Sequence, residues 1–60
     1  MIDVTNIHCV CMKGEEIIIL APPSQLTPEE ALRFAAWIVA LAEPFAEVRF
    51  AEVLAAVHNT

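Results

Sequence analysis

Apolar residues dominate the first third of the chain in two runs that a short polar segment separates. The first run ends near Val10, and the second is the unbroken stretch Ile17–Leu20. Both runs are rich in valine or isoleucine, and such β-branched residues favour strands. Between the runs lies Lys13-Gly14, where the glycine can adopt a positive φ. We therefore predict a β-hairpin over about residues 2–21, with Lys13-Gly14 as its two-residue turn.

This turn fixes the expected strand register, which places Val10 opposite Ile17 and Cys9 opposite Ile18. Side chains alternate between the two faces of a hairpin. One face then carries His8, Val10, Met12, Ile17 and Ile19, and the other carries Ile7, Cys9, Cys11, Ile18 and Leu20. A two-stranded ribbon is marginally stable alone in water. Because both faces are apolar, each requires cover.

A helix start follows at Thr27-Pro28-Glu29-Glu30. This combines a threonine at the N-cap, proline at the first helical position and glutamate three residues after the cap. We predict a helix over about residues 28–42, in which Arg33 forms a surface pair with Glu29. No polar residue occurs between Arg33 and Glu43. A helix that is apolar all round is normally buried.

A second helix is expected over about residues 45–58, because Pro44 either kinks the first helix or separates two helices. An apolar stripe at Phe50, Val53, Leu54 and Val57 supports it. The connection is too short for an ordinary helical hairpin. We therefore expect the second helix to leave at an angle, which favours intertwined subunits. The predicted fold class is α+β, in the order ββαα.

The composition indicates that one chain cannot hide its own apolar surface. Of the 60 residues, 58% are hydrophobic and 18% are charged. An average globular chain is about 45–50% apolar and about 25% charged, and small domains have the most surface per volume. We expect homo-oligomerisation to complete the fold. The expected interface residues are Phe34, Trp37, Ile38, Leu41, Phe50 and Leu54.

A membrane is the rival destination for these apolar residues, but the chain lacks a spanning segment. Its longest apolar run, Phe34–Ala42, is far shorter than the roughly 20 residues required. The opening residues Met1–Val4 have neither the cationic region nor the apolar core of a signal peptide. The expectation is a cytoplasmic protein without a membrane partner, in which Cys9 and Cys11 are free thiols.

The charge balance argues against nucleic acid as a direct partner. The formal net charge is −5, with three basic residues against eight acidic ones. Binding to phosphates requires clustered basic side chains, whereas Lys13, Arg33 and Arg49 are scattered.

The segment His8-Cys9-Val10-Cys11 is the one cluster that resembles a chemical site. Two thiols on one strand face can share a soft metal, but tetrahedral zinc normally requires four ligands from two spaced pairs. Free cysteines also pack as small hydrophobic residues. We predict core packing for both thiols, with no metal and no cofactor.

No motif indicates catalysis. The single glycine, Gly14, excludes a glycine-rich phosphate loop, and so short a chain has little room for a catalytic cleft. We expect a protein that is not an enzyme. Arg33 and His8 are the candidate contacts to a ligand or partner.

Three stretches carry a family resemblance: Glu16–Pro23, Leu26–Arg33 and Ala35–Glu43. Their strand, proline exit and alanine-rich capped helix resemble small uncharacterised accessory proteins of temperate phages of Gram-negative bacteria. The resemblance implies a compact product that acts in the host cytoplasm by binding, such as an inhibitor of a host or defence protein. Some phage proteins of this size instead sequester signalling nucleotides.

Two functions follow as expectations. The first is a non-enzymatic homo-oligomeric binding protein, which the resemblance implies is a phage-encoded inhibitor of a host or defence protein. Its expected partners are itself and a host protein. The alternative is a protein that sequesters a small ligand, such as a signalling nucleotide, in pockets between subunits. The net acidity disfavours the alternative, although backbone amides and one arginine per subunit can still form such a pocket.

Overall fold

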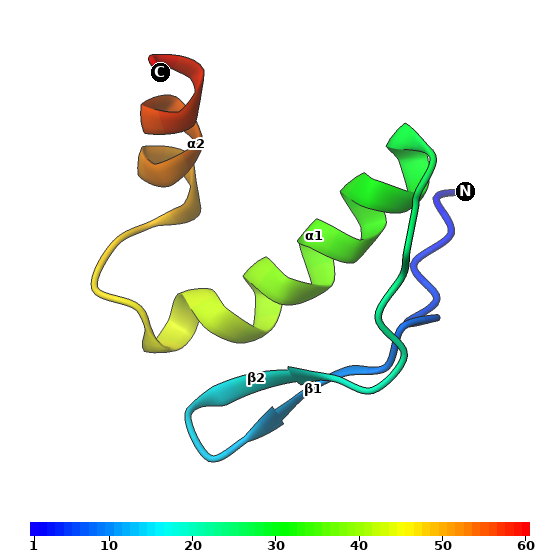
Figure 1. The fold of residues 1–60 in the computed structure, drawn as a ribbon. Coiled ribbons are helices and arrows are strands. Elements are labelled where there is room, and N and C mark those ends of the chain that lie inside the picture. The colour runs from blue at the N-terminus through cyan, green and yellow to red at the C-terminus, as the bar shows by residue number, and fades with distance from the viewer.

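The computed structural model describes residues 1–60 and has two strands followed by helices (Figure 1). In chain order the elements are β1 (Val10–Lys13), β2 (Glu16–Ile19), α1 (Pro28–Ala42), the 3-10 turn η1 (Glu43–Phe45) and α2 (Phe50–His58). The predicted ββαα order of an α+β fold is confirmed.

The strands form an antiparallel hairpin, but the predicted turn and register were wrong. Lys13 pairs with Glu16, so the turn consists of Gly14 and Glu15. Gly14 has a φ of 63°, and glycine at the first of two turn positions is typical of a type II′ hairpin. Val10 therefore lies opposite Ile19 instead of Ile17. The predicted alternation survives within the strands, because a shift of two positions keeps each side chain on its face.

The hairpin is also shorter than the predicted range of residues 2–21. Ile7 and His8 form a turn, and Cys9 has a left-handed backbone with a φ of 50°. The Cys9 N–H donates to the Asn6 carbonyl oxygen at 3.2 Å. This local hydrogen bond bends the chain before β1 begins at Val10. The Cys9 and His8 carbonyl oxygens still accept from the Leu20 and Ala21 N–H groups, but Ile7 makes no backbone hydrogen bond across the hairpin.

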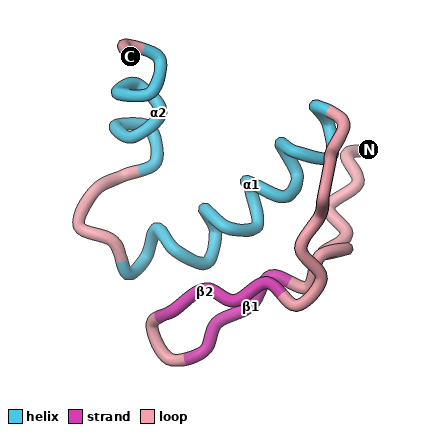
Figure 2. Tube along the Cα trace, viewed as in Figure 1, coloured by secondary structure: helices cyan, strands magenta, loops and turns pink.

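Helix α1 has the predicted range and lies across one face of the hairpin, with contacts to both strands (Figures 1 and 2). Only Val10 is buried, at 3% exposure. No residue of α1 is buried, which differs from the expectation for a helix that is apolar all round. The reason is that the hairpin covers one side of α1 and leaves Leu32, Ala36 and Ala40 exposed.

Helix α2 begins at Phe50, later than the predicted start near residue 45. Pro44 lies in η1 and separates two helices. The chain then becomes extended at Ala46 and Arg49, with ψ angles of 154° and 150°. Figure 1 shows α2 leaving the end of α1 at an angle instead of folding back along it. Neither helix has the length and apolar character required to cross a membrane.

Candidate interaction surface

Two side chains of α1 hold the N-terminal segment in place. The Arg33 Nη1 donates to Asp3 Oδ2 at 2.9 Å, and the Trp37 Nε1 donates to the Val4 carbonyl oxygen at 2.9 Å. The expected pairing of Arg33 with Glu29 was wrong, since the Arg33 ion pair is with Asp3. The first residues therefore run beside α1.

Asp3 is the polar centre of this attachment. Its Oδ1 accepts hydrogen bonds from the Thr5 N–H at 2.9 Å and from the Thr5 hydroxyl at 2.7 Å. These bonds, the backbone one first, lower the pKa of Asp3, and the Arg33 guanidinium lowers it further. The charged form of Asp3 is thus the form that the fold favours.

The N-terminal segment and α1 border a groove of about 830 Å³, which we call the α1 groove. Its apolar lining includes Met1, Ile2, Val4, Leu32, Ala36 and Ala40. Leu32 is 72% exposed and Ile2 is 85% exposed. Because alanine side chains are short, another backbone can approach this side of α1 closely. The groove was not predicted from the sequence, although Leu32 and the apolar N-terminal residues were its signal.

A second unpartnered apolar face lies on α2. Phe50, Val53, Leu54 and Val57 form what we call the α2 stripe, and each is at least 40% exposed. The spacing places the four side chains on one side of the helix. No residue of α2 is buried, so the stripe faces solvent within a single chain.

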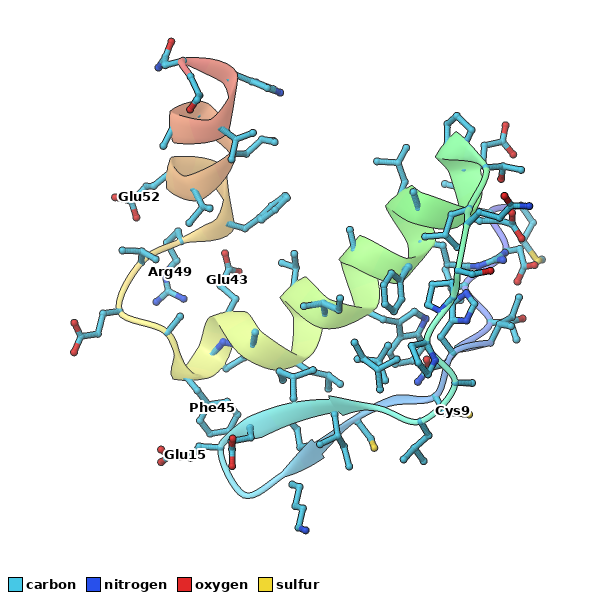
Figure 3. All side chains as sticks on the ribbon, viewed as in Figure 1. Cys9, Glu15, Glu43, Phe45, Arg49 and Glu52 are labelled. Atoms are coloured by element: carbon cyan, nitrogen blue, oxygen red, sulfur yellow. The ribbon has the colours of Figure 1, made fainter.

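Polar contacts at the base of α2 fix where this helix begins. The Phe50 N–H donates to Glu43 Oε2 at 2.7 Å, and the Arg49 N–H donates to Glu52 Oε2 at 2.8 Å. The Arg49 Nη1 donates to the Glu43 carbonyl oxygen at 3.3 Å. Figure 3 shows Glu43, Arg49 and Glu52 where α1 gives way to α2. The two carboxylates satisfy amides that the N-terminus of α2 leaves without intrahelical partners.

The six predicted interface residues divide into two groups. Phe34, Trp37, Ile38 and Leu41 are half-buried on α1 within one chain. Phe50 and Leu54 are exposed on α2. The α1 members therefore already contribute to packing within one chain, whereas the α2 members remain available to another molecule.

His8 and Arg33, the predicted ligand contacts, are both engaged within the chain. The His8 Nδ1 donates to the Ala21 carbonyl oxygen at 2.8 Å. Its ring meets the Phe34 ring edge-on, with centroids 5.2 Å apart and planes at 77°. The cleft between His8, Arg33 and Phe34 holds only about 10 Å³, scarcely the space of one water molecule. His8 thus links the segment before β1 to the segment after β2, and Arg33 links α1 to the N-terminal segment.

The predicted core packing of both thiols was wrong for Cys9, which is exposed, while Cys11 is half-buried. The left-handed backbone at Cys9 removes it from the strand, so it does not share a strand face with Cys11. No group of three or more His, Cys, Asp or Glu side chains is placed to hold a metal ion. The structure thus leaves Cys9 as a surface thiol.

Comparison with known proteins assigns no role to any residue of this site. No protein-family model matches the chain, and neither a curated protein nor a solved structure matches it. The α1 groove and the α2 stripe must therefore be interpreted from their own geometry.

Proposed function

We propose that this chain is the subunit of a small homo-oligomeric binding protein without enzymatic activity. The observation that carries the proposal is the burial of a single residue out of 60. Each large apolar side chain left in water forgoes roughly 1.5–3 kcal/mol. A domain of this size has a total stability of only about 3–9 kcal/mol, so it gains from covering such side chains by association.

The surface area gives the same indication. The chain exposes 5022 Å², whereas a compact monomer of its mass exposes about 3,900 Å². Its radius of gyration is 12.4 Å, compared with about 10.4 Å for a compact chain of this length. The excess of roughly 1,100 Å² exceeds the approximately 800 Å² that each partner buries in a standard interface.

A protein is the partner class that the exposed surface favours. The α2 stripe has the i, i+3, i+4, i+7 spacing of helices that anchor in apolar grooves. The chain carries few basic side chains, and Arg33 is paired with Asp3. Following the phage resemblance, we propose a host or defence protein as the target, bound in the cytoplasm and inhibited.

The α1 groove supports sequestration of a small ligand as the second candidate. Its volume of about 830 Å³ lies within the approximately 300–1,000 Å³ typical of ligand pockets. The lining is mostly apolar and Arg33 is already paired, so an anionic nucleotide would have to compete with Asp3. Mass spectrometry of small molecules released on denaturation tests this candidate.

Dilution tests the oligomer. Because association stabilises only the folded subunit, the Tm of an oligomer depends on concentration. We expect a hundredfold dilution to lower the Tm, with sedimentation equilibrium giving a mass that is a multiple of 6.6 kDa. A 6.6 kDa species whose Tm is indifferent to dilution would contradict the proposal.

A further inference from the structure

We propose that α2 of one copy occupies the α1 groove of a second copy, and that the exchange is reciprocal. This inference rests on the proposed homo-oligomer and specifies its interface. It assigns the α2 stripe and the α1 groove to each other as the two halves of one contact.

The two surfaces match in length and character. The α2 stripe, from Phe50 to Val57, extends about 10 Å at 1.5 Å per residue. The exposed side of α1 from Leu32 to Ala40 extends about 12 Å on the same basis. The stripe is apolar, and the groove is mostly apolar, with Asp3, Glu29 and Arg33 also in its lining. Both surfaces are exposed within one chain. Helix-in-groove binding uses this pairing of a four-anchor helix with an apolar groove.

A chain is not arranged to fill its own groove. The groove lies between α1 and the N-terminal segment, and Figure 1 shows the N-terminus at the opposite end of α1 from α2. The Glu43 carboxylate holds the first amide of α2 at 2.7 Å. Folding α2 back along α1 would require a reversal at this point and would disturb that bond. A second copy can supply α2 without this rearrangement.

Reciprocal exchange also fits the area that needs cover. In a two-fold dimer each chain contributes one α2 stripe and one α1 groove, so the same contact occurs twice. Both of the unpartnered apolar surfaces on each chain then become covered. The excess exposed area of roughly 1,100 Å² per chain is sufficient for a standard interface of about 800 Å² per partner.

Site-specific photo-crosslinking tests the exchange in the full-length protein. A benzophenone amino acid replaces Leu54, with the same change at Val57 as a second position on the stripe. The labelled protein is mixed with an equal amount of unmodified, ¹⁵N-enriched protein. We expect crosslinked peptides that join the α2 stripe to residues 1–4 or 29–40 of the enriched chain. The matched control at Ala55, on the other side of α2, should crosslink to these residues at least tenfold less.

Three results would overturn the exchange: crosslinks from α2 to α2, crosslinks confined to one isotopic species, or equal yields from Leu54 and Ala55. Sedimentation of the same unmodified protein distinguishes the two proposals. An oligomer with one of these patterns leaves the proposed function standing and removes the exchange. A monomer removes both.

Discussion

The Asn6 side chain forms the backbone hydrogen bonds with Val10 that a neighbouring strand would otherwise form. The Val10 N–H donates to Asn6 Oδ1 at 2.9 Å, and Asn6 Nδ2 donates to the Val10 carbonyl oxygen at 2.9 Å. The Cys9 carbonyl oxygen accepts from the Leu20 N–H. Hydrogen-bonded and non-hydrogen-bonded residue pairs alternate along antiparallel strands. Because Cys9 is hydrogen-bonded to Leu20, the next pair, Val10 and Ile19, is a non-hydrogen-bonded one. The backbone N–H and C=O of Val10 therefore point away from β2. Asn6 satisfies them at the only buried residue of the chain.

Replacing Asn6 with alanine should lower the free energy of unfolding by about 1–3 kcal/mol, because two backbone groups lose their partners. Asn6→Asp keeps the acceptor for the Val10 N–H and loses the donor, so its loss should be smaller. Urea denaturation at neutral pH measures both. Equal midpoints for Asn6→Ala and the unmodified protein would show that water replaces the side chain.

The sequence did not reveal this role for Asn6. Asparagine is common in turns, where its side chain bonds the backbone nearby. The bond to Val10 also requires the left-handed conformation of Cys9, which is unusual outside glycine. A non-glycine residue in that region is not marked by any sequence pattern, so the orientation of Cys9 and the true start of β1 were both missed.

At the scale of elements, the start of α1 was predictable because it is local. The Thr27 N–H donates to Glu30 Oε1 at 3.0 Å, and the Glu30 N–H donates to Thr27 Oγ1 at 3.2 Å. These two hydrogen bonds confirm the predicted capping box. It could be predicted because both residues lie within a stretch of four. The register of the hairpin was harder to predict from the sequence, since Gly14 can serve as either the first or the second turn residue.

The α1 cap should make the fold sensitive to acid. The hydrogen bond from the Thr27 backbone, followed by that with its side chain, lowers the pKa of Glu30 from its ordinary value of 4.5. A lowered folded-state pKa gives stability that is complete above the unfolded value and is lost as pH falls through the folded value. We therefore expect stability from this cap to decline below pH 4.5.

Urea midpoints measured between neutral pH and pH 3 test this expectation. Glu30→Gln retains a side-chain oxygen for the Thr27 N–H but cannot ionise, so it should reduce the loss of stability in acid. Asp3 adds a parallel decline, since the bonds from Thr5 lower its pKa from 3.8. Identical pH profiles for Glu30→Gln and the unmodified protein would contradict the assignment to Glu30.

The start of α2 depends on a contact that no short motif describes. Glu43 reaches across seven positions to accept from the Phe50 N–H. Proline at position 44 predicted a break but not the length of the extended segment after it. That length follows from where Glu43 and Glu52 satisfy the amides of Phe50 and Arg49.

Glu43→Ala should loosen the first turn of α2 by about 0.5–2 kcal/mol, comparable to the loss of an N-cap. Amide hydrogen exchange should become faster across Phe50–His58 and remain unchanged in the first half of α1. Glu47→Ala, at an exposed position in the connection, is the matched control and should leave α2 unchanged. Equal exchange in both variants would mean that Glu43 does not fix the start of α2.

At the scale of the whole molecule, the sequence predicted the order of the elements and an excess of apolar surface. It identified only part of the surface that stays uncovered. Four of the six predicted interface residues, those on α1, are half-buried in one chain, whereas Phe50 and Leu54 on α2 are exposed. The exposed fraction is larger still at Met1, Ile2 and Leu32, which were not among the predicted interface residues. Helical periodicity shows which side chains share a face, but which face the hairpin covers depends on how the segments pack.

A charge placed on the α2 stripe should therefore dissociate the oligomer while each separate chain keeps its internal packing. Leu54 is 40% exposed in one chain and no residue of α2 is buried, so Leu54→Asp leaves the buried Val10 and the packing of α1 on the hairpin unchanged. In the exchanged dimer the same change places a carboxylate in each of two apolar grooves and removes a leucine from each. Burial of leucine contributes roughly 1.5–3 kcal/mol per site, and every 1.4 kcal/mol is about tenfold in Kd. We expect Leu54→Asp to weaken association at least a hundredfold by sedimentation, and to lower the Tm toward that of the diluted protein.

Ala55→Asp adds the same charge on the other side of α2 and should remain oligomeric. If both variants associate as tightly as the unmodified chain, the α2 stripe lies outside the interface.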